Sequence, residues 1–419
     1  MRKVANIIIF VLFWLTAAHA APNYPFPQNW QYKYGTRPAL SPEVMAADTQ
    51  TAYLDWSARY VTTEGCAQGA YRVHRYTAYD FDTISAGIGW GMLIAVLLDN
   101  GQNQSQKYFD GFWQYYQGHL NDSGLMAWKI DRAGNILDQE SATEADENVA
   151  MALLFANKQW GSAGQINYLK AGKELITRIF SYEVKVSDED YVVKPGVNWG
   201  GKDIINPAYF DPAFYRIWKN YDKRWLNVTD RAYKLYEIFY YRYKTGLYPD
   251  WCVPEGSTSY LSYNFTYDAS QVPLNIGLDH LWHGKGKKYL IRLNNWISEK
   301  TGERPDLILD GYKLNGTPIG KYNNAAFVGP LAVAAMVAPK YQSWLDALYQ
   351  HLVLMETGGN WGYYPDTIRL VSLLILSGNM PNLWDIKPLR DHDQLERSQF
   401  IPTPKPLVWG FILSNNRTE

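Results

Sequence analysis

Helical patterns recur along almost the whole chain, and this recurrence limits the fold more than any other feature. Each segment carries apolar residues at helical spacing, and most gaps between segments contain Gly, Pro, Asn or Asp, which form turns. We expect about twelve helices, at residues 42–60, 86–99, 103–117, 143–157, 165–181, 208–219, 228–244, 270–283, 286–299, 322–337, 341–354 and 366–377.

Few segments alternate in the way that strands do, and the best candidate is a hairpin at residues 182–193. About twelve helices fit six helical hairpins arranged in a ring, although helix number alone fits a solenoid equally well. Because no motif repeats at a fixed period, the ring is favoured. No Pro/Ser-rich linker or low-complexity tract is visible, so we expect one domain over residues 21–419.

The N-terminus has the pattern of a secretory signal peptide. Arg2 and Lys3 precede an apolar stretch at residues 7–15, and Ala18-His19-Ala20 matches a cleavage site. We expect cleavage after Ala20 and export to the periplasm or the medium of a bacterium. An uncleaved membrane anchor is the less favoured alternative.

The composition points away from nucleic acid and towards sugars. The formal net charge is −1 and no run of Lys or Arg stands out, which argues against nucleic-acid binding. Aromatic residues make up 16% of the chain, with 17 Trp and 33 Tyr. Flat rings can stack on the apolar faces of sugars, so part of this excess is expected to line a groove, while the rest fills the core.

Neither a metal nor another cofactor is indicated. The seven His are scattered, and no Cys/His cluster has the spacing of a zinc site. Cys66 and Cys252 could form a disulfide in an exported chain, but their separation in sequence does not decide this.

Residues 83–99 read T-I-S-A-G-I-G-W-G-M-L-I-A-V-L-L-D. Gly87, Gly89 and Gly91 alternate before an apolar run that suits a buried helix and is too short for a membrane span. Glycines at this spacing permit close approach either of a ligand or of another helix.

Further segments follow in order: 124–131 with Trp128, S-A-T-E-A-D at 141–146, I-N-P-A-Y-F at 205–210, T-G-L-Y-P-D-W at 245–251, Y-D-A-S-Q-V-P at 267–273 and Y-Y-P-D at 363–366. Together with residues 83–99 they resemble the motifs of glycoside hydrolase family 8, from about residue 28 to 380. The resemblance implies an all-α (α/α)6 barrel that hydrolyses β-1,4-linked glycans with inversion at the anomeric carbon.

The resemblance also implies which residues contact substrate. Packing is the alternative for the aromatic residues, and capping in a positively polarised first helical turn is the alternative for the two acids. The expected substrate-binding residues are Trp90, Trp128, Glu144, Asp146, Tyr209, Tyr267, Gln271, Tyr363 and Tyr364.

Asp268 corresponds to the general base of the family, although an Asp before a helical run is also a good N-cap. Gln271 replaces an Arg that helps to hold the attacking water; it can hydrogen-bond water but contributes no charge that would keep Asp268 ionised. The presence of Asp268 favours the glucanase and xylanase branches over the branch with many chitosanases.

Ala86 stands where the resemblance places the general acid, a Glu, and a methyl group cannot donate a proton. Glu144 likewise replaces an Asp that holds the sugar at the cleavage subsite. None of the nearby acids is expected at the leaving oxygen, since an acid must lie within hydrogen-bond reach of it. These acids are Asp80, Asp82, Glu144 and Asp146.

The sequence therefore predicts a monomeric endo-hydrolase of a β-1,4-linked glycan, most plausibly β-glucan or cellulose, with activity impaired by Ala86. One alternative is a non-catalytic glycan-binding protein on the same scaffold. Others are a xylanase or chitosanase of the same family, or an unrelated (α/α) barrel such as a polysaccharide lyase. The joint changes at positions 86, 144 and 271 favour natural divergence over a deliberate substitution.

Overall fold

The computed structural model describes residues 21–188 and 190–388. Residues 21–386 belong to one compact unit, and Lys387–Glu419 form a second unit of which only Lys387 and Pro388 are described. The expected signal peptide at residues 1–20 lies outside the described residues, and a single domain reaching residue 419 stays a prediction. No helix among the described residues is long and apolar enough to cross a membrane.

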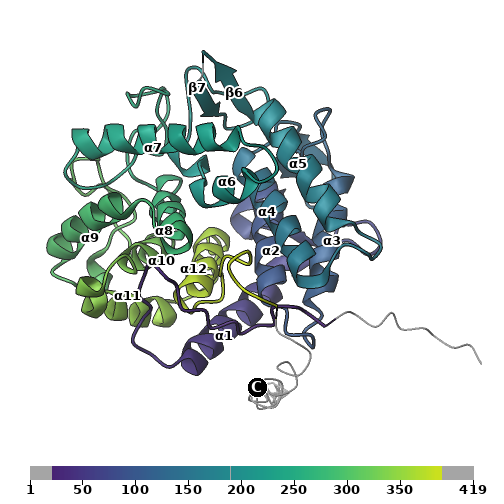
Figure 1. Cartoon of the computed structure of the whole chain (residues 1–419), viewed down its shortest axis with the longest axis horizontal. Coiled ribbons are helices and arrows are strands. Elements are labelled where there is room, and N and C mark those ends of the chain that lie inside the picture. The colour runs from purple at the N-terminus through teal and green to yellow at the C-terminus, as the bar shows by residue number, and fades with distance from the viewer. Residues whose placement is uncertain (1–20, 189, 389–419) are drawn as a thin grey trace, which may run out of the picture. The chain divides into compact units, whose positions relative to one another are not determined.

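The described residues form twelve α-helices in two concentric rings, as expected for an (α/α)6 barrel (Figure 1). Each helix overlaps one of the expected segments. The inner ring contains α2 (Ser85–Leu97), α4 (Thr143–Trp160), α6 (Pro212–Trp218), α8 (Val272–His283), α10 (Ala325–Ala335) and α12 (Tyr363–Leu376). The outer ring contains α1 (Pro42–Tyr60), α3 (Ser105–Gly118), α5 (Tyr168–Glu183), α7 (Trp225–Arg242), α9 (Lys287–Thr301) and α11 (Gln342–Leu354).

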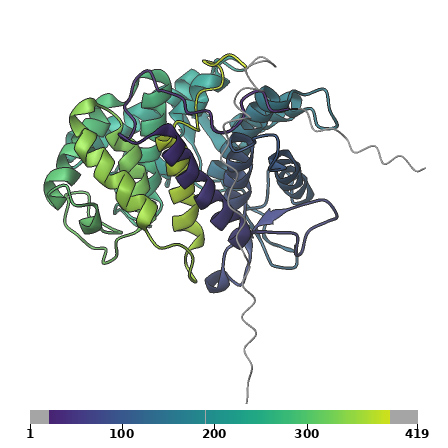
Figure 2. The same cartoon turned by 90° about the horizontal axis from the view of Figure 1, so that it is seen from below.

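Contacts between successive inner helices close the ring. Helix α2 packs on α4, α6 on α8, α8 on α10 and α10 on α12, while the short helix η2 (Pro207–Tyr209), which precedes α6 in the chain, contacts both α4 and α8. Helix α12 then contacts both α1 and α2, so the two ends of the series meet. This closure distinguishes the barrel from the open solenoid that helix number alone allowed, and Figure 2 shows the same helices from below.

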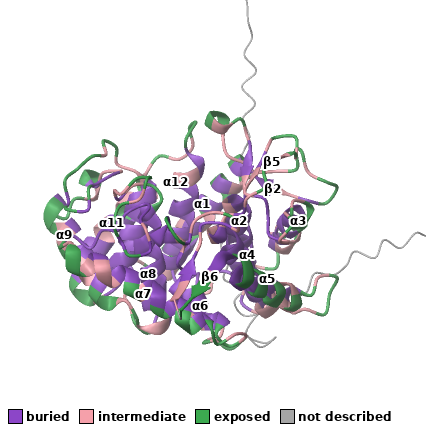
Figure 3. Cartoon of the chain, turned by 90° about the horizontal axis from the view of Figure 1, so that it is seen from above, coloured by how far each residue is buried: buried purple, intermediate pink, exposed green. Residues whose placement is uncertain are grey.

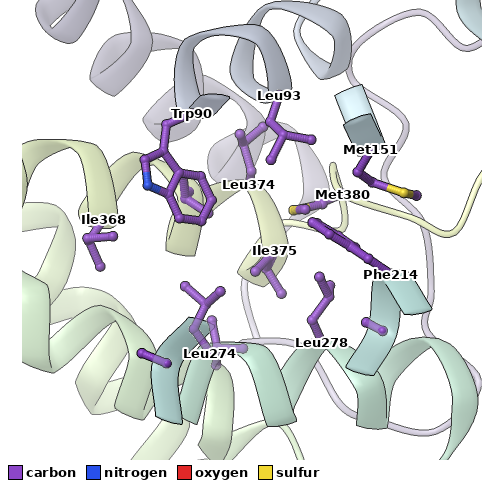
Figure 4. Close-up of a cluster of buried hydrophobic side chains, with 14 of the residues drawn as sticks. Trp90, Leu93, Met151, Phe214, Leu274, Leu278, Ile368, Leu374, Ile375 and Met380 are labelled. Carbon is purple, nitrogen blue, oxygen red and sulfur yellow. The ribbon is translucent and has the colours of Figure 1, made fainter. Parts of the chain in front are cut away.

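Inner helices α2 and α10 are apolar on all sides because other helices cover them. Every residue of α10 is buried, and the interior shown in Figure 4 brings together Trp90 and Leu93 of α2 with side chains of α8 and α12. Exposed residues lie mainly on the outer helices and loops (Figure 3). A helix that is buried on every face reads as uniformly hydrophobic, which is the pattern of residues 86–99 and 325–335.

The alternating glycines of α2 serve helix packing. A Cβ atom on Gly89 would lie 2.8 Å from the Ala145 carbonyl oxygen and 2.8 Å from Asn148 Cβ of α4. On Gly87 it would lie 2.9 Å from the Tyr363 hydroxyl. The space beside these glycines is therefore occupied by protein, and they bring α2 close to its inner-ring neighbours.

The expected hairpin is present as β6 (Val184–Ser187) and β7 (Asp190–Val193), paired antiparallel. Five shorter strands were not expected from the sequence, because two or three residues are too few to show an alternating pattern. They are β1 (Val61–Thr62), β2 (Arg72–Val73), β3 (Thr83–Ile84), β4 (Lys129–Ile130) and β5 (Ile136–Asp138). The sheet β3-β4-β5 fixes the start of α2 beside residues 128–130.

Candidate active site

The N-terminal ends of four inner helices bring most of the expected site residues together. Ala86 lies in the first turn of α2, Glu144 in the first turn of α4 and Tyr364 in the first turn of α12. Asp268 and Gln271 belong to the short helix η3 (Ala269–Gln271) and its N-cap, directly before α8. We call the group formed by Trp90, Glu144, Asp268, Gln271 and Tyr364 the carboxylate site.

The loop that carries Asp268 is held by a buried neighbour, Asp250. One carboxylate oxygen of Asp250 accepts hydrogen bonds from the backbone N–H groups of Thr266, at 3.0 Å, and Ala269, at 2.9 Å. The other accepts from the hydroxyls of Ser262, at 2.7 Å, and Thr266. Because both oxygens are bonded to the loop, Asp250 fixes the backbone on either side of Asp268.

Asp268 does not use its side chain to cap a helix, although its position suited that role. Instead its Oδ2 accepts a hydrogen bond of 2.8 Å from Trp251 Nε1. The residue is exposed to solvent, but the surrounding protein still desolvates its carboxylate. This desolvation, together with the negative charge of Asp250, raises the pKa of Asp268 to about 7, and the Trp251 hydrogen bond opposes the rise.

Glu144 faces the same site from α4. Burial of its carboxyl group, followed by repulsion from Asp268, raises the pKa of Glu144 to about 7, while the Gln271 and Trp90 side chains oppose the rise by hydrogen bonding. Its Oε1 is buried and has no hydrogen-bond partner among the described residues. Two carboxyl groups with raised pKa values therefore share one site, which is a frequent property of active sites.

Gln271 and Tyr364 link the Asp268 loop to α12. Gln271 Nε2 donates to the Tyr364 hydroxyl at 3.1 Å, and that hydroxyl donates to the Tyr267 carbonyl oxygen at 2.7 Å. The Tyr267 hydroxyl in turn donates to Asp310 Oδ2 at 2.9 Å. The amide of Gln271 is thus hydrogen-bonded within the site, without the charge that an Arg would bring.

The expected aromatic residues differ in how deeply they are buried. Trp90 and Tyr363 are buried, whereas Trp128 and Tyr209 are half-buried. The pKa of Tyr209 is raised by burial and by the charges of Glu144 and Asp268, which places its hydroxyl near both acids. The Trp128 carbonyl oxygen accepts from the Ser85 N–H at 2.9 Å, so its backbone also supports the start of α2.

Asp146 is not brought to the carboxylate site. It is fully buried, and its Oδ1 accepts from the Tyr116 hydroxyl of α3. Burial raises the pKa of Asp146 to about 7. Its expected contact with sugar has no support in this geometry, since the carboxyl group faces α3 and fixes the first turn of α4.

Two residues of the site were overlooked in the sequence although their segment was recognised. Asp250 and Trp251 end the T-G-L-Y-P-D-W segment at 245–251, and the structure gives them the tasks of ordering the base loop and contacting Asp268. The signal was an acid and an indole directly after a Pro turn. No local pattern indicated that this turn folds back onto residues 262–269.

A chain of aromatic rings leads from Trp251 to the surface. The Trp251 and Trp199 ring centroids are 4.9 Å apart, and Trp199 Nε1 donates to the Tyr260 hydroxyl at 3.0 Å. Tyr260 is 66% exposed. Elsewhere on the surface Trp361, 67% exposed, packs edge-on against Tyr79 with centroids 5.2 Å apart. These rings are suited to stacking on sugar faces.

The described residues offer no group of three or more His, Cys, Asp or Glu side chains that could hold a metal ion. Cys66 and Cys252, both described, are free thiols. A cavity of about 520 Å³ lies by the C-terminal ends of α6 and α8, where Lys219 and His283 contribute to its wall. Helix α8 has 12 residues, so about 18 Å separate this cavity from the Asp268 end. Lys219, at the C-cap of α6, offsets the helix dipole there, whereas burial lowers the pKa of His283.

Comparison with known proteins agrees with this architecture. The family model described as "Glycosyl hydrolases family 8" matches residues 25–378. The chain is 34% identical over 400 residues to Endoglucanase 2 of Ruminiclostridium josui, covering 92% of this chain and 84% of that protein. It is 36% identical over 399 residues to the Beta-glucanase of Niallia circulans, covering 89% and 95%.

A solved structure extends the agreement to three dimensions. The Beta-1,3-1,4-glucanase from Paenibacillus sp. X4 superposes with a TM-score of 0.80 at 34% identity, covering 86% of this chain and 99% of that one. Sequence, helix order and ring closure thus lead to one assignment: the chain belongs to glycosyl hydrolase family 8.

Proposed function

We propose that this protein is an inverting endo-hydrolase of β-1,4-linked glucan, either cellulose-like or mixed-linkage, with Asp268 as the general base. The observation that carries the proposal is the state of Asp268: its side chain is not used for capping, its loop is fixed by Asp250, and its pKa is about 7. A carboxylate of this kind can accept a proton from water near neutral pH.

The choice of glucan is supported by the relatives. The two curated proteins compared above are called an endoglucanase and a β-glucanase, and the superposed structure is called a β-1,3-1,4-glucanase. The aromatic chain from Trp251 to Tyr260 would offer stacking surface to several sugar units, as an endo-acting enzyme needs.

The decisive experiment measures release of reducing ends from barley β-glucan, carboxymethyl cellulose, xylan and chitosan. We expect release from the two glucans, and we expect NMR spectra of the earliest products to show the α-anomer, as inversion requires. A preference for xylan or chitosan would show that glucan is not the substrate. An initial β-anomer would contradict the inverting mechanism.

A second candidate function is glycan binding without cleavage. It is favoured by Ala86, which removes the acid of the α2 helix, and by Gln271, which is neutral. Isothermal titration with cellotetraose separates the two candidates: binding together with no turnover of any glucan would identify a non-catalytic binding protein.

Trp251→Phe is expected to shift the pH dependence of hydrolysis. The Trp251 N–H stabilises ionised Asp268, so its loss raises the pKa of Asp268 above about 7. Because the base must be ionised, the acidic limb of the kcat/KM profile moves to higher pH, by about one unit for one hydrogen bond to a charged group. Trp199→Phe, which leaves the Trp251 bond intact, is the control and should leave that limb unmoved.

A further inference from the structure

The family has a Glu side chain at the position of Ala86, and Glu144 lies next to the space that such a side chain would fill. Residues 86 and 90 are one helical turn apart, so Ala86 and Trp90 lie on the same face of α2. Glu144 interacts with the Trp90 side chain on that face. The backbones of α2 and α4 are in close contact just before Trp90 and just after Glu144, since a Cβ on Gly89 would lie 2.8 Å from the Ala145 carbonyl oxygen.

The surroundings of Tyr363 agree with this placement of Glu144. A Cβ on Gly87, the residue after Ala86, would lie 2.9 Å from the Tyr363 hydroxyl. Burial is the main reason why the pKa of Tyr363 is raised; the charge of Arg75 opposes the rise, and the charge of Glu144 adds to it. Glu144 therefore lies near the first turn of α2, on the side of the barrel end where Gln271 and Asp268 lie.

One oxygen of the Glu144 carboxyl group has no partner in the protein. Its Oε1 is buried without a hydrogen-bond partner among the described residues. Buried polar atoms are nearly always hydrogen-bonded, so an unpartnered one at a site calls for a ligand or a chemical role. A protonated carboxyl group can donate a hydrogen bond, and it can supply the acidic proton that Ala86 cannot.

Two of the other nearby acids already interact with other side chains. Asp82 forms a two-point ion pair with Arg75, with distances of 2.7 and 2.5 Å. Asp146 is buried against Tyr116 and faces α3. Neither is arranged to protonate a leaving group at the carboxylate site.

We propose that Glu144 is the proton donor of this enzyme, so that the general acid is supplied by α4 instead of α2. The proposal rests on the proposed function, because it assigns a step of glycan hydrolysis. It departs from the sequence-based expectation that no nearby acid reaches the leaving oxygen. The longer side chain of Glu, where the family has Asp, provides the additional reach.

The step is a single displacement at the anomeric carbon. A water oxygen forms a bond to this carbon while Asp268 takes one proton from the water. The bond from the anomeric carbon to the glycosidic oxygen breaks, its electron pair stays on that oxygen, and the carboxyl proton of Glu144 is transferred to it. The products are an inverted hemiacetal and a free hydroxyl, and solvent returns Asp268 and Glu144 to their starting protonation states.

The protonation states fit these roles near neutral pH. With a pKa of about 7, Glu144 still carries its proton in a substantial fraction of molecules, while Asp268 is ionised in a comparable fraction. Because the two acids repel each other, ionisation of Asp268 favours the protonated form of Glu144.

The test compares two substrates that differ in their need for an acid. Barley β-glucan has a poor leaving group that must be protonated, whereas fluoride leaves β-cellobiosyl fluoride with little assistance. The variants are Glu144→Gln, Glu144→Asp, Ala86→Glu and the double variant Ala86→Glu/Glu144→Gln. Glu174→Gln, an exposed residue of α5, is the matched control.

We expect Glu144→Gln to lower glucan hydrolysis by about 10²- to 10⁴-fold, the usual contribution of a general acid, and to change fluoride hydrolysis by less than about tenfold. The basic limb of the glucan pH profile should disappear, since no donor remains to be ionised. Ala86→Glu in the double variant should recover glucan hydrolysis, because a donor is restored from α2. Glu144→Asp should retain only part of the activity, because the shorter side chain reaches less far towards the leaving oxygen. Circular dichroism verifies the fold of each variant.

Other outcomes would overturn the assignment. An equal loss on both substrates, with no recovery by Ala86→Glu, would make Glu144 a sugar-positioning residue. Unchanged glucan hydrolysis in Glu144→Gln would place the donor elsewhere. Cleavage of the fluoride but not of glucan by the unsubstituted protein would show that it has a base and no acid. Failure on both substrates by the unsubstituted protein would refute the proposed function itself.

Discussion

Replacing Asp268 with Asn is expected to reduce kcat for β-glucan by about 10²- to 10⁴-fold, because the amide cannot accept a proton from the attacking water. The substitution preserves shape, and the Asn oxygen can still accept the hydrogen bond from Trp251. The loss should therefore appear in kcat, with KM and the affinity for cellotetraose changed only a few-fold. Fluoride hydrolysis should fall equally, since it also needs an activated water.

The control for this variant is Asp306→Asn, which removes an exposed carboxylate paired with Arg304. It is expected to leave both kcat and KM unchanged. Retained glucan hydrolysis in Asp268→Asn would mean that another loop supplies the base, as in the branch of the family with many chitosanases. Loss of oligosaccharide binding together with kcat would indicate that Asp268 mainly shapes the site.

Gly89→Val is expected to destabilise the barrel by at least about 1–3 kcal/mol, the usual cost of overpacking a tight interior. Its Cβ would lie 2.8 Å from a backbone oxygen and 2.8 Å from Asn148 Cβ, and helix backbone has little freedom to move. Relief requires that α2 and α4 separate, which also displaces the first turn that carries Glu144. Urea denaturation and the melting temperature measure the effect on stability, and glucan hydrolysis measures the effect on the site.

Gly118→Ala provides the comparison, because Gly118 is also helical and a Cβ there meets nothing within 4 Å. This change is expected to be neutral or to stabilise the protein by up to about 1 kcal/mol through helix propensity. If Gly89→Val unfolded at the same denaturant concentration as the unsubstituted protein, the close packing of α2 on α4 would not be required.

The site was predictable to the extent that its residues lie in recognisable local segments. Asp268, Glu144, Gln271 and Tyr364 were named from the sequence and are brought together by the fold. Asp146 was named for the same reason, yet it faces α3. Residues two positions apart on a helix point in different directions, and only the packing of α4 decides which one faces the site.

Trp251 and Asp250 illustrate the opposite case. Their contacts with residues 262–269 join a turn to a loop that follows it, and such contacts leave no periodic signal. The raised pKa values of Asp268 and Glu144 were likewise hidden, because desolvation depends on atoms contributed by several helices.

The sequence by itself determined the helices, their order and the family, because apolar periodicity and turn residues are local properties and the motifs occur in family order. It also exposed the missing acid at Ala86. Only the tertiary structure decided that the helices close into a ring, that the glycines of α2 face protein, and that Glu144 Oε1 is buried without a hydrogen-bond partner among the described residues. The physical reason is that burial, charge repulsion and a missing hydrogen-bond partner depend on groups that are far apart in the chain. These groups come together only when the first turns of α2, α4, α8 and α12 pack at the same end of the barrel.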